Sequence, residues 1–147
     1  MNIIEIKIDK KKYIDLLLLA DEQENMIDLY LERGIMFVLD DNGIKTVCVV
    51  TNEGNGVLEI KNLATHPDFQ NKGYAKKMIE FIENNYKNQF NTLQVGTGKD
   101  TFNVSFYEKR GFKKSHIIKN FFIDNYDHPI FENGVRLVDM VYLKKSI

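Results

Sequence analysis

The sequence has one cysteine and few histidines, and these residues follow no metal-binding or catalytic pattern. Cys48 is the only cysteine in 147 residues, so no disulfide can form within the chain. It lies among valines and threonines in a pattern typical of a strand, where a small buried thiol is the usual finding. His66, His116 and His128 have neither metal-ligand spacing nor the signature of a partner for a catalytic thiol. The sequence therefore predicts a core cysteine and no metal site.

The sequence also lacks a charge excess and long apolar runs. Twenty basic residues oppose 21 acidic ones, and the net charge of −1 disfavours nucleic acid as a partner. No apolar run approaches the roughly 20 residues that cross a bilayer, and Ile14–Ala20 is predicted to be a buried helix face. Residues 1–5 lack the charged start and apolar stretch of a secretory signal. We expect a cytoplasmic protein with no membrane partner.

The common nucleotide motifs, G-x-x-x-x-G-K-[ST] and G-x-G-x-x-G, are absent. A different glycine turn lies between the apolar run 58–64 and the amphipathic run 75–86, and its residues are Gln70, Asn71, Lys72, Gly73, Tyr74 and Ala75. The pattern indicates a strand, a turn and a helix start, whose free N–H groups attract phosphate. Gly73 would let a ligand approach the backbone, and Lys72 adds positive charge. The alternative is an ordinary turn with a solvated lysine.

The spacing of apolar residues predicts a mixed α+β fold with a central twisted, mostly antiparallel sheet. The expected strands are 3–8, 35–39, 44–50, 57–65, 92–97, 112–122 and 135–143. About four helices should flank the sheet: two within 13–31, one at 75–86 and one at 100–110. Asp9 and Asp100 are candidate helix caps. No linker, repeat or low-complexity stretch indicates a second domain, so we expect one domain over residues 1–147.

A second motif follows the turn after about thirty residues. Its residues are Asn103, Val104, Ser105, Phe106, Tyr107, Glu108, Lys109, Arg110, Gly111 and Phe112. Together the two segments resemble the GCN5-related N-acetyltransferase (GNAT) family, in which an Arg/Gln-x-x-Gly-x-Gly/Ala turn holds the pyrophosphate of acetyl-CoA and an Asn-x-x-x-Tyr-Glu-Lys-x-Gly-Phe stretch lies along the pantetheine arm. Both occur in the family's order and separation. Gln70 and Ala75 are common variants, and Arg110 stands where leucine is frequent.

The resemblance extends over about residues 35–123 and implies an acetyl-CoA-dependent N-acetyltransferase. It implies a V-shaped gap between the fourth and fifth strands. The residues it assigns to acetyl-CoA are Leu63, Ala64, Thr65, the turn 70–75, Asn103 and Tyr107. Main-chain N–H groups around 63–65 would stabilise the oxyanion. No nucleophile is supported, so we expect direct transfer without a covalent intermediate.

Two residues are candidates for proton transfer. Tyr107 is the candidate acid, because a neutral phenol can donate to the departing thiolate, although it could instead be an aromatic residue packed on the helix. Glu59, near the middle of its strand, is the candidate base, acting through water, or else an outward strand residue or salt-bridge partner. Asp139 is a second acidic candidate. Asn103, one turn before Tyr107, could reach a pantetheine amide or simply begin a helix.

The acceptor side is less well defined by the sequence. The first two helices and the segment 124–134 should shape it, and that segment contributes Tyr126, Asp127, His128, Phe131 and Glu132. Acids and aromatics suit a cation, so we expect a small-molecule amine. A protein or peptide amine remains open. So does a non-catalytic CoA-binding sensor or partner-binding module. Exposed strand edges make a homodimer plausible.

Overall fold

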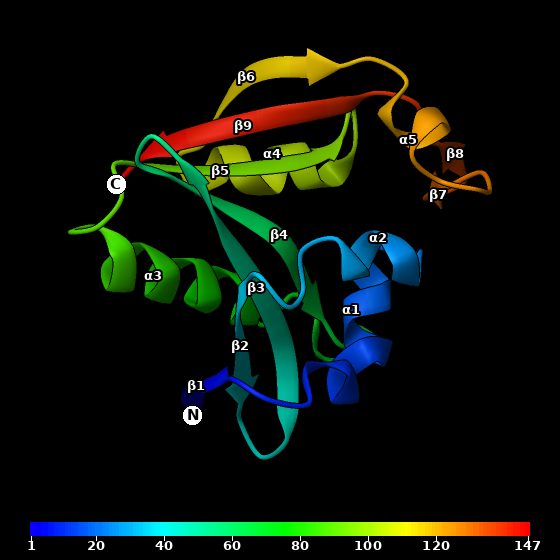
Figure 1. Ribbon diagram of the computed structural model, residues 1–147. Helices are drawn as coiled ribbons and strands as arrows, with labels where there is room; N and C mark the ends of the chain where they lie inside the picture. Colours follow the sequence, from blue (N-terminus) through cyan, green and yellow to red (C-terminus); the bar gives the residue numbers. More distant parts are fainter.

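The structure is a computed structural model that describes all residues 1–147, and a seven-stranded sheet is its centre (Figure 1). The strands of this sheet are β1 (Asn2–Ile6), β2 (Ile35–Asp40), β3 (Ile44–Gly54), β4 (Val57–Thr65), β5 (Thr92–Gly98), β6 (Lys113–Ile118) and β9 (Met140–Ser146). A separate short hairpin consists of β7 (Phe131–Glu132) and β8 (Val135–Arg136). The helices are α1 (Ile14–Ala20), α2 (Glu24–Asp28), α3 (Tyr74–Tyr86), α4 (Phe102–Lys109) and α5 (Phe121–Asp124), with short 3₁₀ turns η1 (Lys10–Tyr13) and η2 (Pro67–Phe69).

The strand order is β1-β2-β3-β4-β5-β9-β6, and β4 with β5 is the one parallel pair. A parallel pair needs a long crossover, and α3 provides it between these two strands. The expected mixed, mostly antiparallel sheet is therefore confirmed. β1 and β6 are its edge strands, and the homodimer expected from exposed edges stays a prediction.

Alternating side chains divide the core between the two faces of the sheet. Phe37 and Cys48 face a cluster that includes residues of α3 and α4, whereas Met36 and Val47 face a cluster that includes residues of α1 and α2. Figure 1 shows α3 on one side of β2–β4 and α1 with α2 on the other. Cys48 is fully buried, and burial raises the pKa of its thiol to about 12, so the side chain is a protonated core residue. None of the helices combines the length and apolar character that a membrane span requires.

A β-bulge at Lys61 reverses which residues of β4 face each side of the sheet. On β3, Val50 pairs with Ile60 while Val49 pairs with Asn62, so Lys61 has no partner of its own. Before the bulge, Ile60 packs with the α3 cluster, and after it Ala64 packs with the α1 cluster. The bulge therefore places Glu59 and Asn62 on the same face of the sheet, the face that α1 covers.

The sheet splays at this bulge. β4 and β5 pair only from Val57 with Thr92 to Ile60 with Val95. Beyond these residues β4 continues beside β3, and β5 continues beside β9 as far as Gly98. The last part of β4 and the last part of β5 thus face each other across an unpaired gap, as the resemblance implied.

Several local expectations were wrong. Asp9 and Asp100 make no capping bond: both adopt positive φ, and Thr101 rather than Asp100 precedes α4. The expected strand 112–122 is shorter, because Asn120 adopts positive φ and starts the one-turn helix α5. The expected strand 135–143 is divided between β8 and β9. In both stretches, the backbone conformation rather than the apolar sequence determines where the strand ends.

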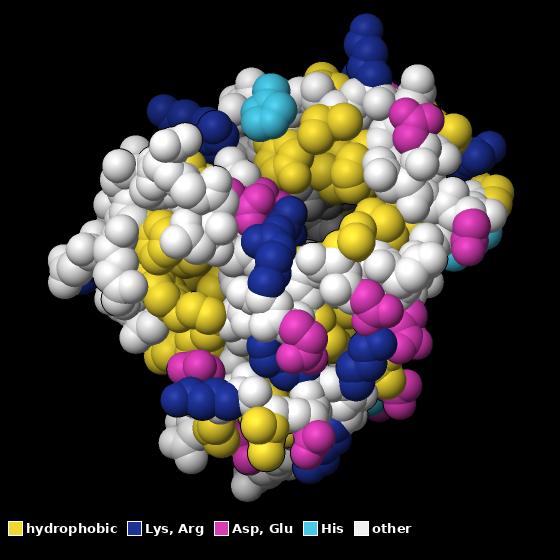
Figure 2. All heavy atoms as spheres, viewed as in Figure 1, with side chains coloured by type: hydrophobic (Ala, Val, Ile, Leu, Met, Phe, Trp, Pro, Cys, Tyr) yellow, Lys and Arg dark blue, Asp and Glu magenta, His cyan; other side chains and the backbone are white.

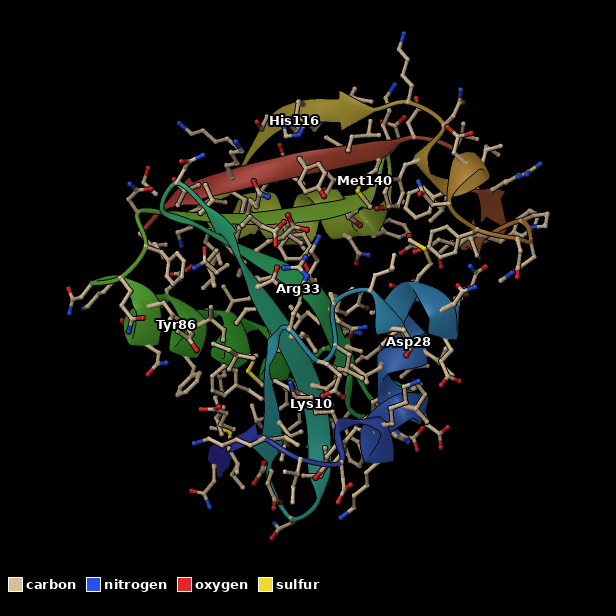
Figure 3. All side chains as sticks on the ribbon, in the orientation of Figure 1. Lys10, Asp28, Arg33, Tyr86, His116 and Met140 are labelled. Carbon is tan, nitrogen blue, oxygen red and sulfur yellow. The ribbon has the colours of Figure 1, made fainter.

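Lys10 is a buried lysine that joins η1 to the segment after α2 (Figure 3). Its Nζ donates to the carbonyl oxygens of Leu31 at 2.9 Å and Gly34 at 2.8 Å, with Glu32 at 3.4 Å. An ammonium group that donates to carbonyl oxygens at the end of a helical segment gives a hydrogen-bond partner to acceptors that would otherwise be buried without one. Lys10 therefore fixes the position of the turns that follow α2, close to the site described below.

We expect Lys10→Met to lower the free energy of unfolding by about 2 kcal/mol, because it leaves these acceptors unpaired. Urea denaturation measures this difference. Lys12→Met is the matched control, since the exposed Lys12 ammonium contacts only the Tyr13 ring, at 5.9 Å, and should change stability by less than about 0.5 kcal/mol. Equal losses for the two variants would contradict the role given to Lys10.

Candidate functional site

The turn before α3 presents a row of free main-chain N–H groups. None of the amides of residues 70–76 donates a hydrogen bond within the protein, and the first bond of the helix runs from Lys77 N to Gly73 O. Gly73 has φ +84°, and a Cβ placed on it would meet no atom within 4 Å. Free amides at a helix start beside open space form an anion-binding arrangement. The turn can therefore hold a phosphate or diphosphate.

Two side chains hold this turn from outside. Gln70 Nε2 donates to Thr65 O at 3.3 Å, and Tyr74 Oη donates to Asp41 Oδ2 at 2.7 Å. These bonds attach the start of the turn to β4 and its end to the β2–β3 hairpin. Because both use side chains, the main-chain amides stay available for a ligand. Asn71 adopts positive φ, and Lys72 lies over the Phe69 ring at 5.6 Å, so its ammonium stays near the turn.

The backbone groups at the end of β4 point alternately toward β3 and into the gap. His66 N donates to Lys45 O, so His66 and, by alternation, Ala64 direct their backbone groups toward β3. Leu63 and Thr65 then direct theirs into the gap, and the Thr65 carbonyl does so when it accepts from Gln70. Of the three residues expected here, Leu63 and Thr65 offer amides to the gap, whereas Ala64 pairs with Val47.

Tyr107 is 7% exposed, and its ring packs edge-on against Phe106 and Phe112. Burial raises the pKa of its hydroxyl, so the phenol is protonated across the ordinary pH range. The Tyr107 hydroxyl has no hydrogen-bond partner. Among fully enclosed side-chain polar atoms, Asn62 Oδ1 alone lacks a partner, so the Tyr107 hydroxyl is not fully enclosed and keeps some contact with solvent. Tyr107 thus combines core packing with an available donor on the α3 face of the sheet.

A cavity of about 310 Å³ opens on the other face, beside the gap (Figure 2). Its floor comes from β4, β5 and β9, including Glu59, Gly96 and Tyr142. One wall comes from α1, α2 and the turns after them, and the other from α5 and the segment that follows it. Figure 2 shows it as a dark hollow, with hydrophobic side chains above it and acidic and basic side chains beside it.

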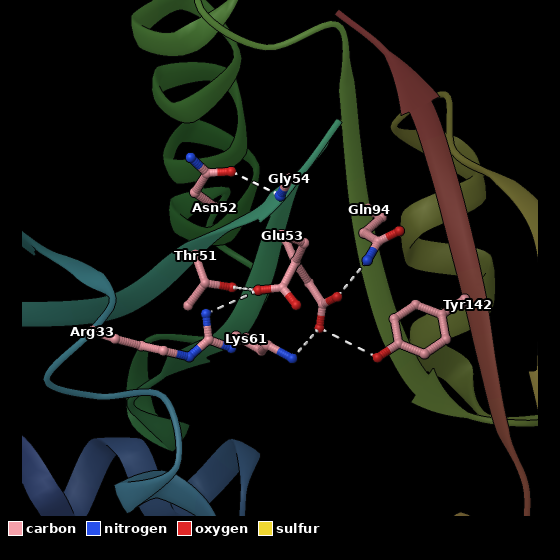
Figure 4. Close-up of polar contacts among 9 residues, drawn as sticks. Arg33, Thr51, Asn52, Glu53, Gly54, Lys61, Gln94 and Tyr142 are labelled. Atoms are coloured by element: carbon pink, nitrogen blue, oxygen red, sulfur yellow. Dashed lines mark hydrogen bonds and ion pairs between the residues drawn. The ribbon is translucent and has the colours of Figure 1, made fainter. Parts of the chain in front are cut away.

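Glu59 is 4% exposed and has three polar partners on this floor. Figure 4 labels these partners, which are Lys61, Gln94 and Tyr142. Glu59 Oε2 forms an ion pair with Lys61 Nζ at 2.7 Å and accepts from Tyr142 Oη at 3.4 Å, while its Oε1 accepts from Gln94 Nε2. Burial raises the pKa of Tyr142, and the Glu59 carboxylate adds to that rise. These partners hold the carboxylate in one orientation at the point where the parallel pairing of β4 and β5 ends.

A second carboxylate, Asp21, joins the two walls. Tyr126 Oη donates to its Oδ1 at 2.7 Å, and Tyr30 Oη donates to its Oδ2 at 3.0 Å. Asn62 Nδ2 donates to Tyr30 Oη at 3.1 Å and to Leu17 O at 2.9 Å. Burial raises the pKa of Asp21, although the two tyrosine bonds oppose the rise. A chain of hydrogen bonds therefore connects the segment after α5 with β4.

Some of the remaining candidate residues line the cavity, and others lie outside it. Asn103 lies at the cavity, with Nδ2 at 3.4 Å from Thr97 Oγ1 and 3.3 Å from Glu132 Oε1. Tyr126 and Glu132 line the cavity, as expected of the acceptor side, whereas Asp127, His128 and Phe131 do not. Asp139, the second acidic candidate, instead accepts a bond from Asn120 N at 2.9 Å and lies outside the cavity lining.

Sequence reasoning did not identify several residues of the cavity. Gln94 and Tyr142 alternate with the core residues Leu93, Val95 and Leu143, so a strand pattern places them on the opposite face. Their contact with Glu59 depends on a parallel register and a crossover that no local pattern encodes. Asp21 lies between α1 and α2, and nothing in the sequence connects it with Tyr126.

Comparisons with known proteins agree with this geometry. Residues 32–114 match the family model for the acetyltransferase (GNAT) domain. YvbK, an uncharacterized N-acetyltransferase of Bacillus subtilis, is 34% identical over 151 residues, and the match covers 97% of each chain. A GNAT family acetyltransferase from Elizabethkingia anophelis, solved with acetyl-CoA bound, is 35% identical with a TM-score of 0.93 over 99% of this chain and 97% of that one. An acetyltransferase of Bacillus subtilis in complex with CoA is 34% identical with a TM-score of 0.88, over 99% of this chain and 98% of that one.

Proposed function

Because this chain belongs to the GNAT acetyltransferase family, we propose that it transfers the acetyl group of acetyl-CoA directly to a primary amine of a small molecule, working as one domain over residues 1–147. The free amides of residues 70–76 carry this proposal. They open beside a sheet gap, and a cavity reaches the same gap from the other face. A diphosphate site, an extended slot and a pocket thus follow one another in the order that acetyl-CoA and an amine require.

The residues of the turn fit the diphosphate of acetyl-CoA. The missing Cβ at Gly73 leaves room for it, and Asn71, Lys72, Tyr74 and Ala75 surround the same opening. The amides of Leu63 and Thr65, which face the gap, suit the pantetheine arm and the carbonyl oxygen of the thioester. Gln70 contributes by orienting the turn. The relative from Elizabethkingia anophelis has acetyl-CoA bound, which supports this assignment by analogy.

Glu59 is our candidate for the group that removes the proton of the amine. An alkylammonium has a pKa near about 10.4, so at neutral pH the acceptor must lose a proton before its nitrogen can attack the thioester carbon. Glu59 lies at the cavity floor, and a water molecule between carboxylate and ammonium would carry the proton. When the C–S bond breaks, the Tyr107 hydroxyl would give its proton to the departing sulfur.

The charges of the cavity support a cationic acceptor. Its acidic residues are Asp21, Glu22, Glu59 and Glu132, and its basic residues are Arg33 and Lys61. Lys61 pairs with Glu59, and Arg33 pairs with Glu53, which lies outside the lining. Burial raises the pKa of Glu132, the negative charge of Glu22 adds to this rise, and neither carboxylate forms an ion pair with a basic side chain. An ammonium group would relieve that repulsion.

The alternative from another class is a CoA-binding sensor that acetylates nothing. An assay of free thiol release with acetyl-CoA and a panel of amines, run beside calorimetry with acetyl-CoA, distinguishes the two. We expect binding together with turnover on at least one small primary amine. Binding without turnover on any amine would favour the sensor, turnover only on peptides would favour a polypeptide acceptor, and no binding would contradict both functions.

Tyr107→Phe tests the proton donor. We expect kcat to fall by at least about tenfold, with KM for acetyl-CoA little changed, because only the leaving thiolate loses a partner. Steady-state kinetics measures both constants. Tyr86→Phe is the matched control, since Tyr86 belongs to the same buried cluster, is 6% exposed and lies at the far end of α3 from the turn. An unchanged kcat in Tyr107→Phe would remove Tyr107 from the mechanism.

A further inference from the structure

The two walls of the acceptor cavity are joined by hydrogen bonds between segments more than 100 residues apart. Tyr126 Oη donates to Asp21 Oδ1 at 2.7 Å, and Asp127 N donates to Gln23 Oε1 at 2.9 Å. We call these two bonds the clasp. Figure 1 shows α2 on the side of the molecule that faces α5 and the β7–β8 hairpin. Both Asp21 and Tyr126 line the cavity, so the clasp is part of its boundary rather than a distant surface contact.

Other contacts hold both halves of the clasp in place. The Tyr126 ring stacks on Phe122, with centroids 5.7 Å apart and planes at 23°, and Phe121 also borders it. On the other side, the second oxygen of Asp21 accepts from Tyr30, which Asn62 of β4 holds in turn. Neither ring nor carboxylate can move alone without losing these partners. The clasp therefore links the two walls and is supported from both sides.

We propose that Tyr126 and Asp21 determine the length of the acceptor, because the bond between them closes the cavity between α2 and α5 to any chain that would continue past it. This inference rests on the proposed function and adds a specificity-determining pair to it. A compact primary amine fits within the cavity on the Glu59 side of the clasp, with its nitrogen toward Glu59. A long amine or a polypeptide would need to pass between the walls, where the tyrosine and carboxylate meet.

The test is a homologous series of straight-chain primary amines, from butylamine to dodecylamine, together with a lysine-containing peptide. We expect kcat/KM of the wild type to fall steeply along the series and to be lowest for the peptide. Tyr126→Phe removes the hydroxyl but keeps the ring. It should raise the dodecylamine-to-butylamine ratio of kcat/KM by about fivefold or more, a modest part of the discrimination that a tight pocket achieves.

Gln23→Ala provides a second, independent variant, because Gln23 contributes to the clasp without lining the cavity. It should shift the ratio in the same direction by a smaller factor. Tyr13→Phe is the control, since Tyr13 is a half-buried tyrosine on η1 outside the cavity. Calorimetry should give the same acetyl-CoA affinity for all four proteins.

The results distinguish a failure of the clasp from a failure of the proposed function. An unchanged length ratio in both Tyr126→Phe and Gln23→Ala, with normal butylamine turnover, would overturn the clasp and leave the acetyltransferase function standing. Wild-type turnover of the peptide equal to that of butylamine would overturn it as well. If no amine were acetylated by any variant although acetyl-CoA bound, the proposed function itself would fail.

Discussion

Gly73→Ala is expected to raise KM for acetyl-CoA by roughly 30-fold while leaving the fold intact. The new methyl group would enter the open space in front of the free amides and keep a phosphate from approaching them. Hydrogen bonds to charged groups contribute about 2 kcal/mol, which corresponds to a factor of roughly 30 in affinity. Calorimetry with CoA, which has the diphosphate but no acetyl group, measures the effect without turnover.

A suitable control is available on the same chain. Gly54 has the same φ of +84°, and a Cβ there would also meet no atom within 4 Å, but it ends β3, away from the turn. Gly54→Ala therefore imposes the same backbone strain without changing a phosphate site. If both variants bound CoA equally well, the amides of residues 70–76 would not be the diphosphate site. A fall in affinity confined to Gly73→Ala would support it.

The turn and its helix could be predicted because their sequence pattern is local. Apolar residues at helical spacing define α3, and all of Met78, Ile79, Ile82 and Tyr86 are buried. Gly73 ends the turn at a φ that favours glycine, so the residue type and the backbone agree. The free amides follow directly from the position of the helix start. For these features, the sequence within a dozen residues contains the required information.

The acceptor cavity could be predicted only in part, because its geometry is long-range. Tyr126 and Glu132 were expected on the acceptor side and line the cavity, yet Asp139, the second acidic candidate for proton transfer, accepts a bond from Asn120 N and lies outside the lining. The bulge at Lys61 changes which face Leu63 and Ala64 occupy, and alternation alone predicts the opposite faces. Such features depend on strand register, which is set by the whole sheet.

With the exception of Lys61, the polar partners of Glu59 likewise could not be predicted from local patterns. Lys61 is next but one to Glu59 in sequence, and on a regular strand both would lie on one face, which makes their ion pair foreseeable. Gln94 and Tyr142 meet Glu59 only because β5 lies between β4 and β9. The clasp joins residues that are still farther apart in the sequence, residues 21 and 126. A sequence can present an acid and a tyrosine, but it does not show that they touch.

Glu59→Gln should lower kcat for amine acetylation by about 100-fold, within the range of general base catalysis, with KM for acetyl-CoA unchanged. Glutamine has nearly the same shape and can still accept from Tyr142, but it cannot take a proton from the ammonium. If the carboxylate is the base, the loss should be largest at low pH and should shrink as pH rises toward the pKa of the free amine, where more acceptor is already neutral. Kinetics across this pH range measures the trend.

Two controls isolate the carboxylate of Glu59 from its surroundings. Glu53→Gln removes the neighbouring acid, which lies outside the cavity lining and binds Arg33 and Thr51. It should leave kcat within about threefold, because a group outside the reaction contributes no proton transfer. Lys61→Met removes the ion pair but keeps the base. If Lys61→Met lost as much kcat as Glu59→Gln with the same dependence on pH, orientation by the ion pair rather than proton transfer would explain the effect. If Glu59→Gln lost nothing, Glu59 would be a structural residue that joins β4, β5 and β9.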